Sequence, residues 1–177
     1  MNIVGINDGH NASVALCTDG KLVFALSEER PSRIKNFWGL PKISLDIIFR
    51  EHCAKDMIDY FGIFRSSGAD FWAYLYPHHQ RANKYSLRWL FQIFVESVSP
   101  KFMTLLDKLT PKSFLISYYA NLLDVPKEKI ILVNHHRCHV EAARFSLNNE
   151  LPWLIVTVDG EGDLESGTVY KTTNYGD

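Results

Sequence analysis

The sequence predicts an α/β domain whose N-terminal segment forms an antiparallel three-stranded meander in a mixed sheet with flanking helices. Three apolar runs at residues 2–7, 11–17 and 21–27 are each rich in Val, Ile, Leu or Phe, and polar corners separate them. Helix-like and strand-like segments follow in the rest of the chain, as in mixed α/β domains. With 177 residues, the chain is long enough for one ordinary domain or one lobe of a larger enzyme, but not for two full-sized domains.

Turn chemistry defines how the meander is connected and where it ends. The corner Thr18-Asp19-Gly20 favours a type I′ hairpin turn, because Asp and Gly tolerate the positive φ that this turn requires. Residues 28–35 are too charged to continue a strand, and Pro31 interrupts them. We therefore expect this segment to leave the sheet as a loop.

Apolar periodicity predicts the elements beyond the meander. Pro41 opens an expected helix that runs to about residue 53, with Ile43, Ile47 and Ile48 on one face. Two further helices are expected at residues 111–123 and 136–147, the second with Val140, Ala143 and Leu147 at core spacing. The expected strands are residues 58–64, residues 130–133, a buried strand at 153–158 and, after a turn at Ser166-Gly167, residues 168–172.

A change of composition marks residues 66 to about 113 as an insertion within the single unit 1–177. The segment is rich in aromatic residues and holds six basic side chains against three acidic ones. We expect it to be mostly helical, with one helix near residues 86–98 and another within 101–109. The pair His78-His79 has no acid at ligand spacing and is expected to lie on the surface.

Charge and cysteine usage exclude several classes of protein. The formal net charge is -1, so no basic field favours nucleic acid as a partner. Three cysteines in no paired spacing fit a reduced, cytoplasmic compartment better than a disulfide framework. The most apolar stretch, residues 87–98, contains charged residues and is much shorter than the roughly 20 residues of a membrane span.

The first candidate site is the corner after the first strand, Asn7-Asp8-Gly9-His10-Asn11-Ala12-Ser13. Its backbone N–H groups can hold a phosphate, and the Asp8 carboxylate can hold a metal directly or through water. Asn11 and Ser13 add small polar groups. Most Asp-Gly corners are simply turns, but His10 places a titratable imidazole where a turn does not require one.

The second candidate is the run His135-His136-Arg137-Cys138-His139 at a strand–helix junction. His135 and His139 are four residues apart, so in a helix they share a face and can present two nitrogens to one divalent ion, while His136 points elsewhere. A solvated or core-packed histidine pair is the open alternative. The His-Glu-x-x-His protease motif is absent, and no Pro-Cys-x-x-Cys follows His139-Val140-Glu141 as in zinc deaminases.

The third candidate is the glycine-rich segment Asp159-Gly160-Glu161-Gly162-Asp163 after the expected buried strand. Asp159 at the strand end would complete the two histidines to three protein ligands with positions left for water or substrate. Gly160 and Gly162 would let backbone amides approach a phosphate closely. A glycine-rich turn with a solvated acidic run is the alternative.

The fourth candidate is a pair of basic residues, Arg33 and Lys35, in the charged segment after the third strand. Arg33 offers a bidentate fork and Lys35 a point charge to an anionic substrate. Surface lysines and arginines more commonly serve solubility, and the spacing alone leaves that alternative open.

In their order along the chain, these motifs resemble a known family. Residues 3–13, the Glu-Glu-Arg-Pro-Ser-Arg-Ile-Lys run at 28–35, the histidine run at 135–139 and Val-Asp-Gly-Glu-Gly at 158–162 resemble the N-terminal part of carbamoyltransferases of the nodulation-protein U and cephamycin/tobramycin type. The resemblance implies an incomplete actin/Hsp70/sugar-kinase-like (ribonuclease H-like) lobe, similar to the tRNA threonylcarbamoyl-transfer protein.

The resemblance also implies a reaction. In that family a carbamoyl group from carbamoyl phosphate is activated with ATP as carbamoyl-adenylate and passed to a hydroxyl of a sugar or antibiotic precursor. The C-terminal half of the enzyme, absent from this chain, would supply the adenine pocket. An inactive metal- or phosphate-binding fragment and a kinase or threonylcarbamoyl-type transferase remain alternatives.

Residue roles follow from the resemblance in the same way. It implies that His135, His139 and Asp159 bind a divalent metal, foremost iron, with zinc or magnesium as alternatives. His10 would act at the transfer site as a base or orienting group. Arg33 and Lys35 would lie near the anionic donor.

Overall fold

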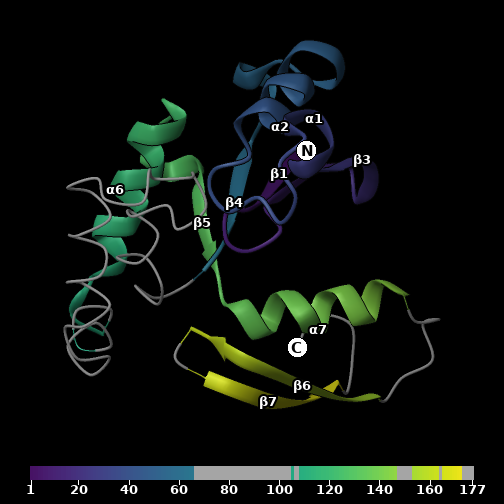
Figure 1. Cartoon of the computed structure of the whole chain (residues 1–177), viewed down its shortest axis with the longest axis vertical. Helices are drawn as coiled ribbons and strands as arrows, with labels where there is room; N and C mark the ends of the chain where they lie inside the picture. The colour runs from purple at the N-terminus through teal and green to yellow at the C-terminus, as the bar shows by residue number, and fades with distance from the viewer. Residues whose placement is uncertain (66–104, 106–107, 147–152, 164, 173–177) are drawn as a thin grey trace.

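The computed structural model describes residues 1–65, 105, 108–146, 153–163 and 165–172 (Figure 1). The predicted insertion at about 66–113 and its two expected helices lie almost entirely outside these residues. Leu147, which we expected at core spacing, lies outside them as well. In the described part of the chain, no helix is long and apolar enough to cross a bilayer.

A five-stranded mixed sheet forms the body of the molecule, with strand order β3-β2-β1-β4-β5. Its first three strands are antiparallel neighbours, whereas β1, β4 and β5 run parallel. Asp19 and Gly20 have φ of 49° and 77°, the positive values expected of a type I′ turn. The α/β class and the N-terminal meander are thus confirmed. The strands are β1 (Asn2–Asn7), β2 (Ser13–Thr18), β3 (Lys21–Ser27), β4 (Tyr60–Phe64) and β5 (Ile130–Val133).

The segment after β3 contains a helical turn, so the prediction of a loop over residues 28–35 is wrong in part. Helix α1 (Glu29–Ser32) is closed by hydrogen bonds from the Ser32 N–H to Glu28 O and from the Arg33 N–H to Glu29 O. Pro31 is compatible because its missing N–H falls in the first turn, where no intrahelical acceptor is available. Arg33, at φ 59°, ends the helix.

The helix expected after Pro41 is present, and the face expected to be apolar is buried at Ile48 but not at Ile43. Helix α2 (Lys42–Ile47) continues into the π-helical turn η1 (Ile48–His52), and the 3₁₀ turn η2 (Lys55–Met57) follows. Leu45 and Ile48 are buried, whereas Ile43 is 42% exposed. The buried Glu28 carboxylate accepts hydrogen bonds from the start of α2, which directs Ser44 rather than Ile43 inward.

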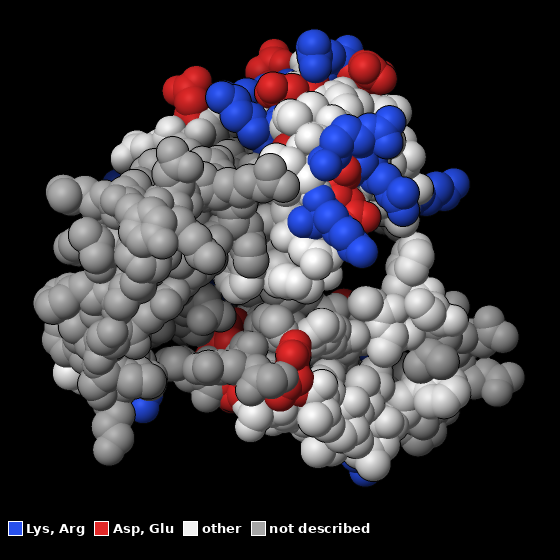
Figure 2. Space-filling model, viewed as in Figure 1, with Lys and Arg blue, Asp and Glu red and all other residues white. Residues whose placement is uncertain are grey.

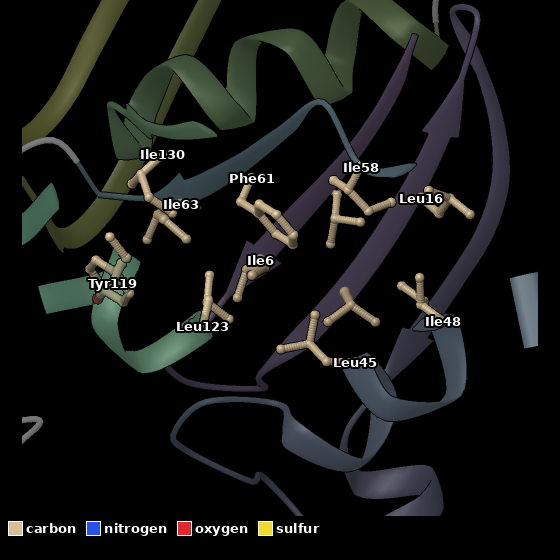
Figure 3. Close-up of a cluster of buried hydrophobic side chains, with 13 residues drawn as sticks. Ile6, Leu16, Leu45, Ile48, Ile58, Phe61, Ile63, Tyr119, Leu123 and Ile130 are labelled. Atoms are coloured by element: carbon tan, nitrogen blue, oxygen red, sulfur yellow. The ribbon is translucent and has the colours of Figure 1, made fainter. Parts of the chain in front are cut away.

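One hydrophobic core lies between the sheet and two helices, α2 and α6 (Lys112–Leu123) (Figure 3). Alternate strand residues point to this face, as the period of two in a strand requires. Helix α6 matches the predicted helix at 111–123, and the 3₁₀ turn η3 (Lys127–Lys129) leads from it toward β5. The core consists of Val4, Ile6, Val14, Leu16, Leu45, Ile48, Ile58, Phe61, Ile63, Tyr119, Ala120, Leu123 and Ile130.

The C-terminal strands form a separate two-stranded antiparallel sheet, β6 (Trp153–Gly162) with β7 (Glu165–Thr172). Helix α7 (His135–Ser146) lies along this hairpin (Figure 1). The prediction of a buried strand at 153–158 is confirmed for one face and wrong for the other. Ile155 and Thr157 are buried, whereas Leu154, Val156 and Val158 are 67%, 57% and 83% exposed.

The turn predicted at Ser166-Gly167 is also wrong, since both residues lie inside β7. Gly167 pairs with Val158 across the hairpin. A Cβ on Gly167 would lie 2.8 Å from the carbonyl oxygen of Thr157, so this glycine is required by close approach of two strands and not by a turn.

Candidate metal centre

Three parallel strands end at one edge of the large sheet, and the candidates Asp8 and His135 follow two of them. Asp8 follows β1, Arg65 follows β4, and Asn134 and His135 follow β5. Ligand sites of open α/β sheets lie at the carboxyl ends of parallel strands. This edge is therefore where sheet topology alone would place a site.

Helix α7 starts at His135, one residue earlier than predicted. The Oδ1 atom of Asn134 accepts the Arg137 N–H at 2.9 Å, which is an N-cap interaction. A second acceptor comes from the hairpin, because Oδ2 of Asp163 accepts the His135 N–H at 2.7 Å. The start of helix α7 is therefore anchored to the turn between β6 and β7.

The side chains of His135, His139 and Asp159 converge on one point. Nε2 of His135 lies 2.8 Å from Oδ2 of Asp159 and 3.0 Å from Nε2 of His139, which is 3.3 Å from the same carboxylate oxygen. The histidines stand one helical turn apart on α7, and Asp159 lies in β6, after Val158, where the register with β7 shifts. Their side chains are 16%, 48% and 40% exposed, so one side of the cluster is open to solvent.

These distances fit a bound divalent ion. Donor atoms about 2.1 Å from an ion stand roughly 3.0 Å apart when their bonds meet at right angles, and roughly 3.4 Å apart in a tetrahedron. The three separations here span 2.8 to 3.3 Å. Two neutral imidazoles plus one carboxylate on a single face are the donor set of non-haem iron and of catalytic zinc, whereas magnesium prefers oxygen donors.

Phe64, the last residue of β4, packs against the cluster. Its ring centroid lies 4.4 Å from that of His135 and 6.3 Å from that of His139. Phe64 could not be predicted as part of the site, because nothing local distinguishes it from other core aromatics of a strand. Burial also raises the pKa of the neighbouring Cys138 thiol to about 11, so the thiol is protonated near neutral pH.

Asp8 lies in the interior. Its side chain is fully buried, with Oδ1 accepting from Nη2 of Arg65 at 3.0 Å and Oδ2 accepting from the Tyr119 hydroxyl at 2.5 Å. The carboxylate therefore connects the ends of β1 and β4 to helix α6. Neither Arg65 nor Tyr119 was among the predicted site residues.

His10 is exposed and is held by its backbone against the segment that precedes α2. His10 and Trp38 form an antiparallel bridge, and their rings meet edge to face with centroids 6.0 Å apart. Hydrogen bonds from the Ala12 N–H to Phe37 O and from the Gly39 N–H to Asp8 O join the same two segments. The corner is thus a structured part of the molecule.

The other predicted binding residues lie in three different parts of the fold. Arg33 and Lys35 are exposed in the stretch between α1 and the His10–Trp38 bridge. Asn11 is exposed with φ 56°, and Ser13 begins β2 opposite Asn7. Gly160 and Gly162 lie in the last part of β6. On the face seen in Figure 2, charges of both signs stand side by side around α1 and α2.

Comparison with known proteins gives a family match over almost the whole chain. A family model described as the carbamoyltransferase N-terminus matches residues 2–175. The chain is 32% identical to nodulation protein NolNO of Sinorhizobium fredii over 160 residues, which are 89% of this chain and 20% of that relative. It is 46% identical to an uncharacterized protein of Methanocaldococcus jannaschii over 66 residues, which are 36% of this chain and 13% of that relative. The chain thus spans about a fifth or less of the length of these relatives.

Proposed function

The chain belongs to the carbamoyltransferase N-terminus family, and from this premise we propose that it is the N-terminal part of an O-carbamoyltransferase. The proposed donor is carbamoyl phosphate, activated with ATP as carbamoyl-adenylate, and the acceptor is a hydroxyl of a sugar or antibiotic-like molecule. Because the chain spans only 20% of NolNO, we propose that transfer requires the remainder of a longer polypeptide. The chain alone would then bind ligands without turnover.

The proposed lobe is of the actin-like, ribonuclease H-like type. Support comes from the strand order β3-β2-β1-β4-β5, in which an antiparallel meander is extended by two parallel strands. The corner that carries His10 follows β1, and His135 follows β5, so these candidates lie at carboxyl ends of parallel strands, where open α/β sheets bind ligands.

The observation that carries the proposed chemistry is the convergence of His135, His139 and Asp159 within 3.3 Å of one another. These side chains would hold a divalent metal, foremost iron and otherwise zinc. Bound there, the ion would supply Lewis-acid stabilisation of the negative charge that develops on a carbonyl oxygen under attack. The protein's own contribution would be a helix–strand pair that presents two imidazoles and one carboxylate to the same point.

His10 has the proposed role of accepting the proton of the acceptor hydroxyl. Its imidazole is exposed to an incoming substrate, and Trp38 restricts its ring. Imidazole is the side chain best suited to take up a hydroxyl proton near neutral pH. The hydroxyl oxygen would then bond to the carbamoyl carbon as the bond from that carbon to the adenylate phosphate oxygen breaks.

Residues that bind the anionic donor complete the proposal. Arg33 and Lys35 provide positive charge, and the corner with Asn11 and Ser13 provides backbone and side-chain donors. Gly160 and Gly162 would allow close backbone approach. The Asp8 carboxylate makes interior contacts with Arg65 and Tyr119. Its proposed contribution to binding is therefore to stabilise the conformation of the corner.

The decisive experiment measures carbamoyl transfer, and carbamoyl-phosphate-dependent ATP turnover, with and without the remainder of a full-length relative. We expect transfer only in the combined sample. His10→Asn should abolish transfer while the metal content stays intact, whereas His135→Ala and His139→Ala should lower the metal content. Full activity of the His10→Asn variant would remove the role of His10, and unchanged metal content in both alanine variants would remove the ligand assignment.

A further inference from the structure

We propose that His136, Thr157 and Thr168 form a positioning network that holds the proposed metal ligands at binding distance. The three residues are not ligands themselves. They connect helix α7, which carries His135 and His139, to strand β6, which carries Asp159. The inference rests on the proposed metal site and adds to it the residues that set its geometry.

His136 is fully buried, unlike the two histidines beside it. Its Nδ1 lies 2.7 Å from the Thr157 hydroxyl, and its Nε2 lies 3.0 Å from the carbonyl oxygen of Glu165. The Thr157 hydroxyl also lies 2.6 Å from the Thr168 hydroxyl and accepts the Thr168 N–H at 3.2 Å. Helix α7 is therefore bonded to both strands of the hairpin through one imidazole ring.

Donor and acceptor rules assign the hydrogens of this network. A carbonyl oxygen only accepts, so Nε2 of His136 must carry a hydrogen toward Glu165. A neutral ring with that hydrogen accepts at Nδ1 from the Thr157 hydroxyl, which in turn accepts from the Thr168 hydroxyl. Every polar atom of the ring is then satisfied, as a buried polar side chain requires.

The network lies directly beside the ligands. The ring of His136 meets the rings of His135 and His139 at centroid distances of 5.3 and 6.3 Å. Thr157 stands two residues before Asp159, on the face of β6 that packs toward α7. Because the ligands come from two elements, any slide of α7 along β6 would separate the histidine nitrogens from the carboxylate. The hydrogen bond between His136 and Thr157 joins the same two elements beside the ligands and opposes that slide.

The test measures Co²⁺ binding to the full 177-residue chain by competition with a chelating indicator and by the visible absorption of bound Co²⁺. Thr157→Val keeps the shape of the side chain but removes the hydroxyl, so Nδ1 of His136 loses its donor. We expect Co²⁺ affinity to fall about 10- to 100-fold, the range typical of lost outer-shell partners. Thr157→Ser, which keeps the hydroxyl, should restore most of the affinity.

Val156→Thr is the matched control. It adds a hydroxyl instead of removing one, on the opposite, exposed face of the same strand. It should leave Co²⁺ affinity unchanged. Thr168→Val probes the outer end of the network and should reduce affinity by a few-fold, and it replaces Thr157→Val if that variant does not fold. Circular dichroism of the metal-free proteins separates loss of positioning from loss of structure.

The outcomes separate the two proposals. If the unaltered chain binds Co²⁺ and both valine variants bind it equally well, the positioning network is refuted while the metal site stands. If the unaltered chain binds no Co²⁺, the metal site itself is refuted, and the inference that depends on it falls too.

Discussion

The hydroxyl of Tyr119 donates a hydrogen bond to Oδ2 of Asp8 at 2.5 Å, across a separation of 111 residues in the sequence. Both residues are fully buried, and Arg65 donates to the other carboxylate oxygen. The Asp8 carboxylate therefore connects the turn that carries His10 to helix α6 and to the end of β4. The packing of α6 and the placement of the proposed transfer site are coupled through this carboxylate.

Tyr119→Phe should lower the free energy of unfolding by about 2 kcal/mol, because it deletes a hydrogen bond to a buried charged group. Urea denaturation measures this loss, with Tyr60→Phe on the exposed part of β4 as the control. Asp8→Ala should cost more than Tyr119→Phe, since it removes the buried ion pair with Arg65 and the acceptor of the Tyr119 hydroxyl together. A Tyr119→Phe variant as stable as the parent would show that the contact contributes nothing.

Glu28→Gln should destabilise the fold by about 2 kcal/mol. The Glu28 carboxylate is buried and accepts from the N–H groups of Ile43 and Ser44 and from the Ser44 hydroxyl, at 3.0, 2.8 and 2.6 Å. An amide would turn an NH₂ group toward donors at the positive end of α2. Thermal unfolding of Glu28→Gln and of the more exposed Glu29→Gln distinguishes this capping role from a general effect of charge.

Local signals explain why the meander and the histidine pair could be predicted from the sequence. The Asp19-Gly20 turn sets the register of its two strands, and a spacing of four places His135 and His139 on one helical face. Both patterns depend on neighbours along the chain. The sequence also indicated Asp159 as a third ligand, because an acid follows an apolar strand there.

The contacts that support the site depend instead on tertiary packing. Asp8 looks like a turn residue in the sequence, and only its burial against Arg65 and Tyr119 reveals its interior role. Thr157 lies in an apolar run that resembles a buried strand, although that strand belongs to a two-stranded hairpin with one face exposed. No local pattern separates these cases.

Gly167→Ala should weaken metal binding without touching a ligand. Its Cβ would lie 2.8 Å from the Thr157 carbonyl oxygen, a backbone atom that cannot turn aside, so β7 must move away from β6. The Thr157–Thr168 contact should loosen, and Co²⁺ affinity should fall about tenfold. Gly62→Ala is the control, because its Cβ would meet only a Val133 methyl at 3.9 Å. Equal affinities in the two variants would contradict the prediction.

Tyr118→Phe should make the protein less sensitive to alkali. Burial, and then the negative charge of Asp8, raise the pKa of the Tyr118 phenol above 10, while Arg65 opposes the shift. The folded state therefore keeps this proton to higher pH than the unfolded chain does. The resulting stabilisation is complete below pH 10 and is lost as the pH rises through the folded-state pKa.

Without the phenol, this part of the pH dependence should disappear. The free energy of unfolding of Tyr118→Phe should consequently decline less steeply above pH 10 than that of the parent protein. Urea denaturation at a series of pH values measures the slope, and the difference in tyrosinate absorbance between the two proteins reports the ionisation of Tyr118 itself. A difference spectrum that titrates at or below pH 10 would show that neither burial nor the charge of Asp8 acts on the ring as the structure indicates.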